Sequence, residues 1–373
     1  MQLVNESEML AMLRNANTVC LVEPNYQSKY PPLGLMKISS YCKQHNVLVT
    51  NQEYSKIALF CITSLFTYDI GIVKQTIFDI RKRYPHAKVI LGGVCASLMS
   101  TSFKDFAIYL FRGNSFKLDE CVPDYSMDWG KQNPWNDFTF TFTSRGCPNA
   151  CGYCAVWRIE PCIGLIDNWR AHLDVPKKFA MISDNNLSST PDSHLFPILR
   201  YLKENKLPIV FDNGFDCKHM NSDVAKALGQ LIFTQKGCRT AFDRIEEKIL
   251  FKKSITMLIE AGVPAGQIMS YVLFNFNDNP IEAFYRMHLC RSLGISPYPQ
   301  QYRPLSWRSR EDLYIGKHWN ETLLKAFRPY WVYPEIYRNY TFAEYLKSSR
   351  NEVKLTTAQR KKFAEIETEA HKC

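Results

Sequence analysis

The sequence predicts an α/β protein built from two successive series of strand and helix units. Short apolar, β-branched runs alternate with amphipathic helix patterns over residues 1–115, and a second alternating series covers residues 138–305. Hydrophobic residues make up 46% of the 373-residue chain and charged residues 22%, which is typical of globular proteins and excludes bulk disorder. A chain of this length is expected to form about two domains.

The first series predicts a Rossmann-like domain with a parallel sheet over residues 1–115. Five apolar runs read as buried strands: Val19–Val22, Val47–Thr50, Ile57–Ile62, Val89–Leu91 and Ala107–Phe111. Helix patterns cover Gly34–Gln44 and Asp69–Arg83 between them. Residues 116–137 are rich in Pro, Gly, Asp and Asn, and we expect them to form a linker.

The second series predicts a partial (β/α)6 barrel over residues 138–305. Six runs read as its strands: Phe138–Thr143, Phe179–Ser183, Ile209–Asp212, Cys238–Phe242, Ile268–Leu273 and a last strand near Gln300–Arg303. Helix patterns follow the strands, and one of them begins at Pro280, a residue type that fits the first turn of a helix. In barrels of this kind the chemistry takes place at the carboxyl ends of the strands.

Residues 306–373 form a basic, aromatic C-terminal extension. Residues 302–373 include 14 Lys and Arg, 9 Asp and Glu, and 13 aromatic residues. We expect a helical cap whose aromatic side chains pack on the barrel. A groove that stacks nucleic-acid bases is the alternative interpretation of the same pattern.

Charge and cysteine content narrow the protein's setting. The net charge of +10 permits a polyanionic partner without requiring one. Thirteen Cys in a long chain indicate a reducing compartment, so we expect a cytoplasmic protein. The sequence offers neither an apolar run long enough for a membrane span nor a basic secretory leader.

One short segment carries recognisable chemistry. Directly after the strand at Phe138–Thr143, three cysteines with the spacing C-x3-C-x2-C follow one another: Cys147, Cys151 and Cys154. Three thiolates from one loop can hold three irons of a 4Fe-4S cubane and leave the fourth iron open to a ligand from outside the protein. A zinc site is the alternative, but zinc usually takes a fourth protein ligand, and Cys162 is poorly spaced for that role.

The motif and its context resemble the radical S-adenosylmethionine (radical SAM) superfamily. Arg145-Gly146 before the first Cys and Tyr153 before the third are typical of that family, as are six βα units. The resemblance implies that the open iron binds the methionine group of SAM. It also implies reductive cleavage of SAM to a 5′-deoxyadenosyl radical that takes a hydrogen atom from the substrate. An external electron donor, such as flavodoxin or ferredoxin, is implied as well. The overall pattern is also loosely similar to radical SAM proteins carried by phages.

The same resemblance places SAM and substrate contacts after successive strands. Polar residues stand at these positions: Asp184, Asn185, Asn186, Asp212, Asn213, Asp216, Asp243, Arg244, Asn275 and Asn277. Each cluster could instead serve turns and helix caps, which favour Asp and Asn. That all of them follow consecutive strands favours a shared site.

The first block resembles the cobalamin-binding domain that precedes many radical SAM barrels. The matching pieces include Val19–Glu23, Pro31–Leu35 and Leu91–Val94. The block lacks a D-x-H-x-x-G motif and leaves room only for a turn between Val47–Thr50 and Ile57–Ile62. We therefore expect a shortened domain that kept the scaffold and lost cobalamin.

Three functional hypotheses follow. The first is radical modification of a base in DNA or RNA, which rests on the net charge and on the basic, aromatic tail. The second is a cobalamin-dependent methyltransferase that acts on a small molecule or a peptide. The third is a non-enzymatic, cluster-bearing redox or binding module, which the complete set of βα units and the open iron position disfavour.

Overall fold

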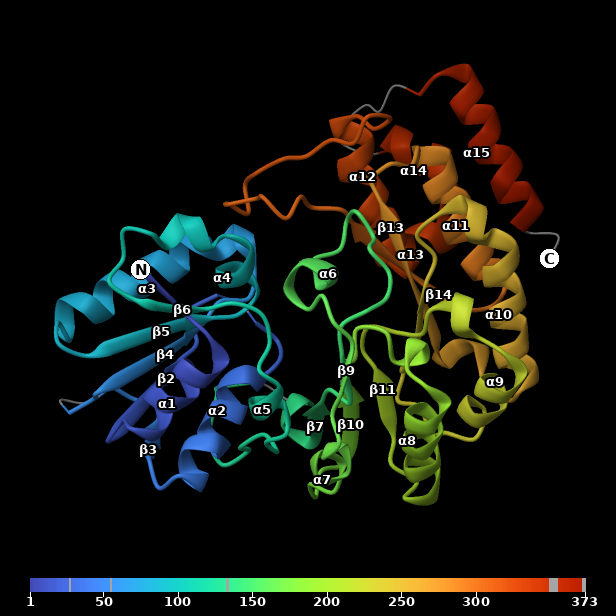
Figure 1. Cartoon of the computed structure of the whole chain (residues 1–373). Helices are drawn as coiled ribbons and strands as arrows, with labels where there is room; N and C mark the ends of the chain where they lie inside the picture. The colour runs from blue at the N-terminus through green and yellow to red at the C-terminus, as the bar shows by residue number, and fades with distance from the viewer. Residues whose placement is uncertain (27, 54–55, 132–133, 349–354, 371–373) are drawn as a thin grey trace. The chain divides into compact units, whose positions relative to one another are not determined.

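The computed structural model describes residues 1–26, 28–53, 56–131, 134–348 and 355–370. The chain is a mixed α/β protein that divides into two compact units (Figure 1). Unit 1 comprises residues 1–185 together with 304–312, and unit 2 comprises residues 186–303 together with 313–373. The division falls inside the second series of strand and helix units. Residues 349–354 and 371–373 of the expected C-terminal extension lie outside the described residues.

Unit 1 contains a six-stranded parallel sheet, which confirms the predicted sheet of the first block. Its strands are β1 (Gln2–Val4), β2 (Thr18–Val22), β3 (Leu48–Thr50), β4 (Leu59–Thr63), β5 (Lys88–Gly92) and β6 (Tyr109–Phe111). They lie in the order β1-β6-β5-β4-β2-β3. Without the edge strand β1, this is a doubly wound order in which the chain changes direction across the sheet between β2 and β4.

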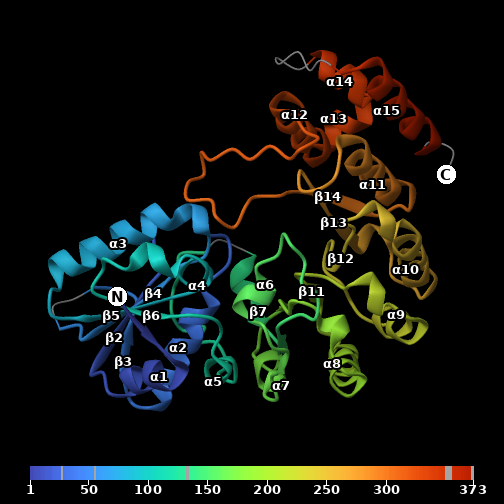
Figure 2. The same ribbon diagram turned by 45° about the horizontal axis from the view of Figure 1, so that its top comes forward.

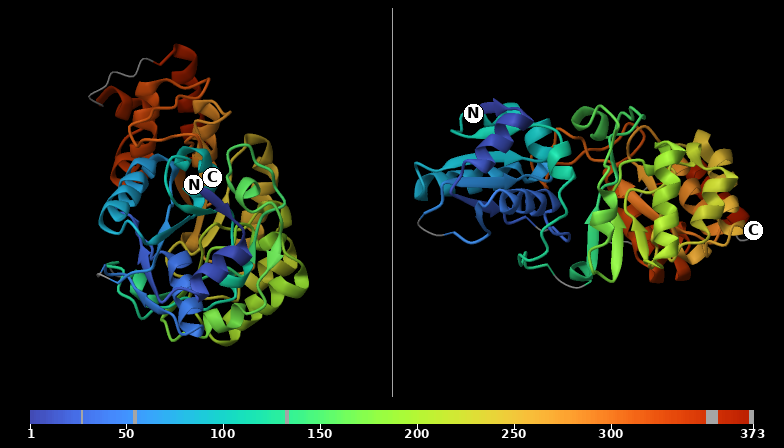
Figure 3. Two further views of the ribbon diagram at one scale, coloured as in Figure 1. Left: turned by 60° about the vertical axis from the view of Figure 1, so that its left-hand side comes forward. Right: turned by 60° about the horizontal axis from the view of Figure 1, so that its bottom comes forward.

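Helices cover both faces of this sheet (Figures 1 and 3). They are α1 (Glu6–Arg14), α2 (Leu33–Gln44), α3 (Ile70–Arg83), α4 (Val94–Leu98) and α5 (Phe116–Asp119). Successive residues of β2 point to opposite faces, so Val19 and Leu21 pack in the cluster with α1 and α2, whereas Cys20 packs in the cluster with α3 and α4. Burial on both faces explains why these strands read as continuous apolar runs.

The rest of unit 1 carries the cysteine motif. Its elements are β7 (Phe138–Thr141), β8 (Ser144–Arg145), α6 (Val156–Ile159), β9 (Gly164–Leu165), α7 (Trp169–Leu173) and β10 (Phe179–Ile182). Strands β7 and β10 pair in parallel, as expected for successive βα units. Strands β8 and β9 pair antiparallel and were not expected.

Unit 2 continues the alternation of strands and helices. Its elements before the C-terminal region are α8 (Asp192–Glu204), β11 (Ile209–Phe211), α9 (Ser222–Leu228), β12 (Cys238–Ala241), α10 (Lys248–Glu260), β13 (Ile268–Phe274), α11 (Pro280–Ser292) and β14 (Ser296–Gln301). Strands β12, β13 and β14 form a parallel sheet. The backbone of β11 joins β12 through the bond from Phe211 N to the Gly237 carbonyl, 2.9 Å.

The last strand of unit 2 begins earlier than predicted. We expected it near Gln300–Arg303, but β14 spans Ser296–Gln301 and pairs with β13 along its whole length. Pro297 and Pro299 hide the strand in the sequence because proline cannot donate to a sheet ladder. It is tolerated here at positions that do not donate to β13.

The C-terminal region is helical, as predicted. Helices α12 (Glu321–Val332), α13 (Pro334–Asn339), α14 (Phe342–Ser348) and α15 (Thr357–Ala370) gather beside α11 and β14 (Figure 2). Their aromatic side chains pack on the strand and helix units. The ring centroids of Phe327 and Phe274 are 4.9 Å apart, and those of Trp331 and Phe284 are 5.5 Å apart. No helix in the described ranges combines the length and the hydropathy needed to cross a membrane.

Candidate metal and cofactor site

The three motif cysteines lie in one loop that is closed at its base. Strand β8 enters the loop and β9 leaves it, with Ser144 opposite Leu165 and Arg145 opposite Gly164. The segment between the two strands carries Cys147, Cys151 and Cys154, and all three side chains are half-buried. A short ladder therefore presents three thiols from a single, defined segment of backbone.

Gly146, directly before the first cysteine, is required by the shape of this base. Its φ of +79° is a conformation that L side chains rarely adopt. An added Cβ would also lie 2.3 Å from the carbonyl oxygen of Cys162 on the returning strand. The two arms of the loop thus approach more closely than any other residue type would allow.

Backbone N–H groups point to two of the thiols. Asn149 N lies 3.5 Å from the Cys147 sulfur, and Val156 N lies 3.4 Å from the Cys154 sulfur. Such donors favour a negatively charged sulfur and tune the potential of a bound cluster. The backbone of Cys151 is held in turn by the Trp157 ring N–H, 3.0 Å from its carbonyl oxygen.

The donor set fits a cubane better than a single ion. Within the described residues, no three His, Cys, Asp or Glu side chains converge as ligands for one metal ion. A 4Fe-4S cluster does not need such convergence, because each thiolate binds its own iron and the sulfurs stand apart around the cubane. Three half-buried thiols in one loop, with N–H donors beside two of them, meet that requirement.

Asp184 holds the chain where it enters the loop. Its buried carboxylate accepts hydrogen bonds from Thr143 N, Thr143 Oγ1 and Ser144 Oγ, each 2.6 Å long. These bonds fix the backbone between β7 and β8, just before the first cysteine. The residue predicted to contact SAM is therefore occupied with positioning the cysteine loop.

Arg145 is fixed from two sides. Its Nε and one terminal nitrogen each lie 2.8 Å from an oxygen of Asp119, at the end of α5. Its guanidinium also stacks on Phe142, 3.5 Å from the ring centroid. The same carboxylate pairs with Lys37 of α2 at 2.8 Å, and both of those side chains are almost fully buried.

Glu160 connects the loop to the end of β10. One of its oxygens accepts from Gly146 N at 3.0 Å and from Asn185 Nδ2 at 2.6 Å. Its other oxygen lies 3.3 Å from Arg145. Asn185, predicted as a SAM contact, is thus brought to the cysteine loop.

Part of the expected linker is an anchor for this loop. Residues 116–119 form α5. The Phe116 ring packs directly on Gly164 of β9, and a Cβ added to that glycine would lie only 2.1 Å from a carbon of the ring. The Glu120 carboxylate accepts from the backbone N–H of Asp167 and Asn168 at 3.2 and 3.0 Å, just beyond β9. The proline and glycine content of residues 116–137 predicted irregular backbone and missed these contacts.

In unit 2 the structure brings together Asn186 and Asp216. Asn186 Nδ2 lies 3.4 Å from Asp216 Oδ2, and its Oδ1 accepts from Ser188 Oγ at 2.9 Å. Asp216 N in turn donates to Ser188 Oγ at 3.0 Å. The segment after β11 is therefore tied to the start of unit 2 through Ser188, which the sequence analysis did not single out.

The other residues after β11 and β12 differ in how firmly they are held. Asp212 pairs with Arg239 of β12, and its backbone carbonyl accepts from the Tyr271 hydroxyl at 2.9 Å. Asn213 beside it is exposed. Asp243 Oδ1 accepts from Leu273 N at 3.1 Å, and the exposed Arg244 pairs with Glu247.

Asn275 and Asn277, after β13, have different surroundings. Asn275 is fully buried with a φ of +70°, and its side chain bonds the Tyr314 carbonyl at 2.9 Å and Gly316 N at 2.7 Å. These bonds hold the backbone of residues 314–316 against the end of β13. Asn277 is exposed and remains accessible to a ligand.

Arg286 of α11 braces the ends of β12 and β13, and the sequence analysis missed it. The side chain is fully buried and donates to the carbonyl oxygens of Phe242 and Leu273 at 2.8 and 2.7 Å. It also pairs with Asp278 at 2.6 Å. Arg286 is spaced along the helix so that it shares a face with the buried Ala283, Met287 and Cys290. This spacing could have identified it from the sequence, because a cation on the buried face of a helix needs hydrogen-bond and charge partners.

At the switch-point edge of the six-stranded sheet, Gly93 and Asp69 are held by protein contacts. A Cβ on Gly93 would lie 2.4 Å from the Ser64 carbonyl oxygen, and Ser64 Oγ bonds Gly92 and Ala96. Beyond β4, the buried Asp69 is paired through both oxygens with Arg310 of the 304–312 segment, at 2.7 and 2.9 Å. Gly93 therefore packs on the neighbouring strand end, whereas a Cβ on Gly92 would meet no protein atom within 4 Å.

Comparisons with known proteins add no family to these observations. No protein-family model matches the chain, and no curated protein matches it significantly.

Proposed function

We propose that the chain is a radical SAM enzyme. The observation that carries the proposal is the loop with Cys147, Cys151 and Cys154, which offers three thiols after a parallel strand and leaves a cubane one iron short of protein ligands. A site with four thiols would be closed to an outside ligand. The partial barrel expected over residues 138–305 belongs to the same proposal.

The bound cluster would supply one electron that cleaves the C5′–S bond of SAM, giving methionine and a 5′-deoxyadenosyl radical that takes a hydrogen atom from the substrate. The electron comes from an external donor such as flavodoxin or ferredoxin. The chain's own contribution is to bind and position. The three thiolates hold the irons, and Asn149 N and Val156 N stabilise the charge on two sulfurs.

Six of the ten predicted polar residues fall into two groups. Asp184, Asn185 and Asn275 make internal hydrogen bonds that fix backbone, so we assign them positioning roles. Asn213, Arg244 and Asn277 are exposed after successive strands, and we assign SAM or substrate contact to that set. Arg286 would support the set by holding the ends of β12 and β13 together.

We propose a nucleic-acid base as the substrate and a reaction without cobalamin. The net charge of +10, half of it in the aromatic C-terminal region, supports a polyanionic substrate. The contacts of Ser64, Gly93 and Asp69 support a first domain that serves as a scaffold. Nothing in the described residues favours the alternative, a cobalamin-dependent methyltransferase.

Cluster assembly tests the first part of the proposal. Anaerobic reconstitution of the wild type should yield about four irons and four sulfides per chain. Cys147→Ala, Cys151→Ala and Cys154→Ala should each lose most of that iron and all SAM cleavage. Cys162→Ala is the matched control, because this exposed thiol lies in the same loop outside the motif. Full iron content in any motif variant, or equal loss in the control, would overturn the assignment.

Product formation tests the substrate. The reduced protein is incubated with SAM and single-stranded DNA, duplex DNA or tRNA, with and without cobalamin, and 5′-deoxyadenosine is followed by mass spectrometry. An increase with one nucleic acid and without cobalamin is the expected result. An increase that depends on cobalamin and ignores nucleic acid would favour the methyltransferase. No 5′-deoxyadenosine from protein with an intact cluster would refute the radical SAM proposal.

A further inference from the structure

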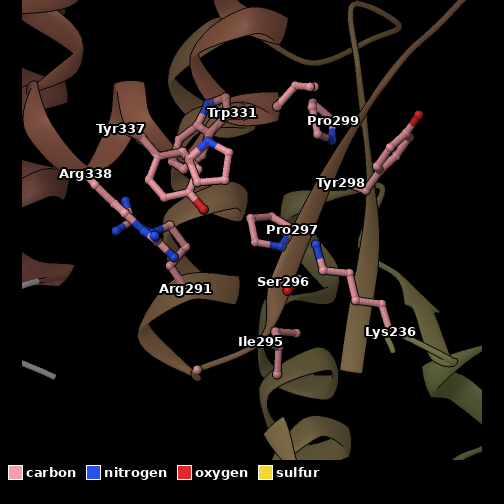
Figure 4. Close-up of a pocket in the computed structure, with 13 residues that line it drawn as sticks. Lys236, Arg291, Ile295, Ser296, Pro297, Tyr298, Pro299, Trp331, Tyr337 and Arg338 are labelled. Carbon is pink, nitrogen blue, oxygen red and sulfur yellow. The ribbon is translucent and has the colours of Figure 1, made fainter. Parts of the chain in front are cut away.

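A basic, aromatic pocket lies in unit 2 between β14 and the C-terminal helices (Figure 4). Its volume is about 370 Å³, which falls within the range of small-molecule sites. The walls come from the end of α11, the first residues of β14, helices α12 and α13, and Lys236 before β12.

Every charged side chain on the pocket wall is basic. These are Lys236, Arg291 and Arg338, and none of the three forms an ion pair within the described part of the chain. Arg291 is held in place by the Tyr337 ring, 4.4 Å from its guanidinium carbon to the ring centroid. Three basic side chains on one pocket wall without a carboxylate favour an anionic ligand, and arginine favours phosphate in particular.

Aromatic surface faces the same space. Trp331 and Tyr337 line the pocket from the side of the C-terminal helices, whereas the ring of Tyr298 lies across β14 from them and packs on Tyr271 (Figure 4). The indole N–H of the buried Trp331 has no hydrogen-bond partner among the described residues. That N–H is enclosed by protein atoms, so Trp331 offers the pocket its ring and not its donor.

The edge of β14 excludes an added peptide strand. Tyr302 N donates to the Phe274 carbonyl of β13, so the N–H groups of even-numbered residues face β13 and odd-numbered positions face outward. Pro297 and Pro299 occupy two outward positions and have no N–H to offer. An occupant must therefore be held by side chains.

The pocket stands apart from the proposed SAM-binding edge. Lys236 precedes β12, and Gly294 to Ser296 precede or begin β14, so the pocket lies at the amino ends of these parallel strands. Asp243, Arg244 and Asn277 follow the carboxyl ends of β12 and β13. The two sets of residues lie at opposite ends of the same sheet.

We propose that this pocket binds a nucleotide, with its phosphate on the cations and its base against the aromatic side chains. Stacking and phosphate contact together are how proteins hold unpaired bases. The proposal extends the nucleic-acid part of the proposed function, since a second site would hold a substrate strand while another nucleotide is modified. It does not depend on the cluster, because every residue involved lies in unit 2.

Binding of a fluorescent single-stranded oligonucleotide, measured by anisotropy, tests the proposal on the full chain. The double variant Lys236→Gln/Arg338→Gln should bind at least tenfold more weakly, and the slope of log affinity against log salt should fall by about one to two. Lys252→Gln/Lys253→Gln, which removes the same charge from the exposed face of α10, should change affinity less than threefold. Equal losses in the two double variants would overturn the proposal.

Two further arms identify what the pocket recognises. Tyr337→Ala should weaken single-strand binding about tenfold and leave weak duplex binding unchanged. Competition by a nucleoside monophosphate at micromolar concentration would show that a free nucleotide suffices, whereas competition only by oligonucleotides would assign the site to a strand. Competition by inorganic phosphate as effective as that by the nucleotide would contradict a role for the base.

The outcome can be separated from that of the proposed function. Cys147→Ala should bind the oligonucleotide like the wild type, because it leaves the pocket intact. If the pocket variants lose oligonucleotide binding but SAM cleavage fails in every protein, the proposal of a nucleotide-binding pocket is supported and the radical SAM proposal is refuted. If pocket variants bind normally while nucleic acid stimulates 5′-deoxyadenosine formation, the pocket proposal alone falls.

Discussion

Arg145 and Asp119 form a two-pronged ion pair that joins the first residues of the cysteine loop to helix α5. Both hydrogen bonds are 2.8 Å long, and Lys37 completes the cluster from α2. Burial alone would raise the pKa of Asp119, but the charges and hydrogen bonds of Arg145 and Lys37 lower it to about 2. The carboxylate is therefore ionised wherever the protein is folded at ordinary pH, and it fixes both cations.

We predict that Asp119→Asn destabilises unit 1 and impairs the cysteine loop. The change leaves the buried Lys37 without its counter-charge and leaves Arg145 paired with Glu160 alone, which should lower the free energy of unfolding by about 3–5 kcal/mol in urea titrations at pH 7. The iron bound per folded chain should fall as well, because Arg145 lies two residues before Cys147. In the wild type, the contribution of the Asp119 carboxylate to the free energy of unfolding should be lost as the pH falls from 3.8 towards 2, because the unfolded chain then binds the proton more readily than the folded one.

Asp137→Asn is the control for this prediction. Asp137 pairs with Lys178 at 3.2 Å, but the lysine side chain is 71% exposed, so the pair should contribute about 1 kcal/mol or less. Indistinguishable effects of the two variants would show that the buried cluster does not support the loop.

In the first block the sequence predicted β2 to β6 and the helices α2 and α3, because their buried residues form apolar or periodic runs, but it did not predict α1, α4 or α5. The first four residues of β4, Leu59 to Ile62, are all apolar, and α3 repeats its buried residues at helical spacing. Strand β1 was missed because its three residues include only one buried side chain. Strand β14 was displaced by its two prolines, whose position on the open edge is a property of the sheet.

The cysteines of the candidate site could be predicted from the sequence, but the residues that hold the cysteine loop in place could not. The C-x3-C-x2-C spacing is contained in eight residues, so it could be found without a fold. Asp119 and Arg145 lie 26 residues apart and meet only through the packing of α5 against β8. Asp184 was selected for its place after a strand, but the sequence could not show that Thr143 and Ser144 would occupy its oxygens.

Gly146→Ala should disturb the cysteine loop specifically. The new Cβ would meet the Cys162 carbonyl oxygen at 2.3 Å in a backbone with φ +79°, so the two arms of the loop must separate. We expect iron content after reconstitution to fall to less than half of the wild-type value. Gly71→Ala is the control, since its Cβ meets nothing within 4 Å and it lies in α3, where alanine should stabilise the chain by about 0.5–1 kcal/mol. A fully loaded Gly146→Ala protein would refute this account of the loop.

His172 predicts a loss of stability in mildly acidic solution. Burial, with a smaller effect of Lys37, lowers the pKa of this histidine from 6.5 to about 4, and its Nδ1 lies 2.8 Å from Thr141 Oγ1. Because the unfolded chain binds this proton more readily, the free energy of unfolding should fall as the pH drops from about 6.5 towards 4.

Between pH 7 and pH 5 the contribution of His172 should be about 2 kcal/mol. His172→Gln should be less stable at pH 7 but should lose less stability on acidification. Urea titrations of both proteins at the two pH values measure the difference. Parallel losses in wild type and variant would mean that His172 is not the group responsible.

Arg286→Met should destabilise unit 2 and release the ends of two strands. The substitution keeps much of the side-chain volume but leaves the carbonyl groups of Phe242 and Leu273 without a donor, and Asp278 without its cation. We expect a loss of about 3–5 kcal/mol in the free energy of unfolding. Arg200→Met on the exposed face of α8 removes the same charge and should change stability by about 0.5 kcal/mol or less.

A second readout separates stability from positioning. Asp243 is held by Leu273 N, so the brace at Arg286 and the predicted ligand Asp243 share the same strand end. Arg286→Lys keeps the charge but cannot span both carbonyl groups and Asp278 at once, because its three donors diverge from one atom. If Arg286→Lys folds yet binds SAM several-fold more weakly, the brace positions the site. If its SAM affinity equals that of the wild type, Arg286 serves only the fold.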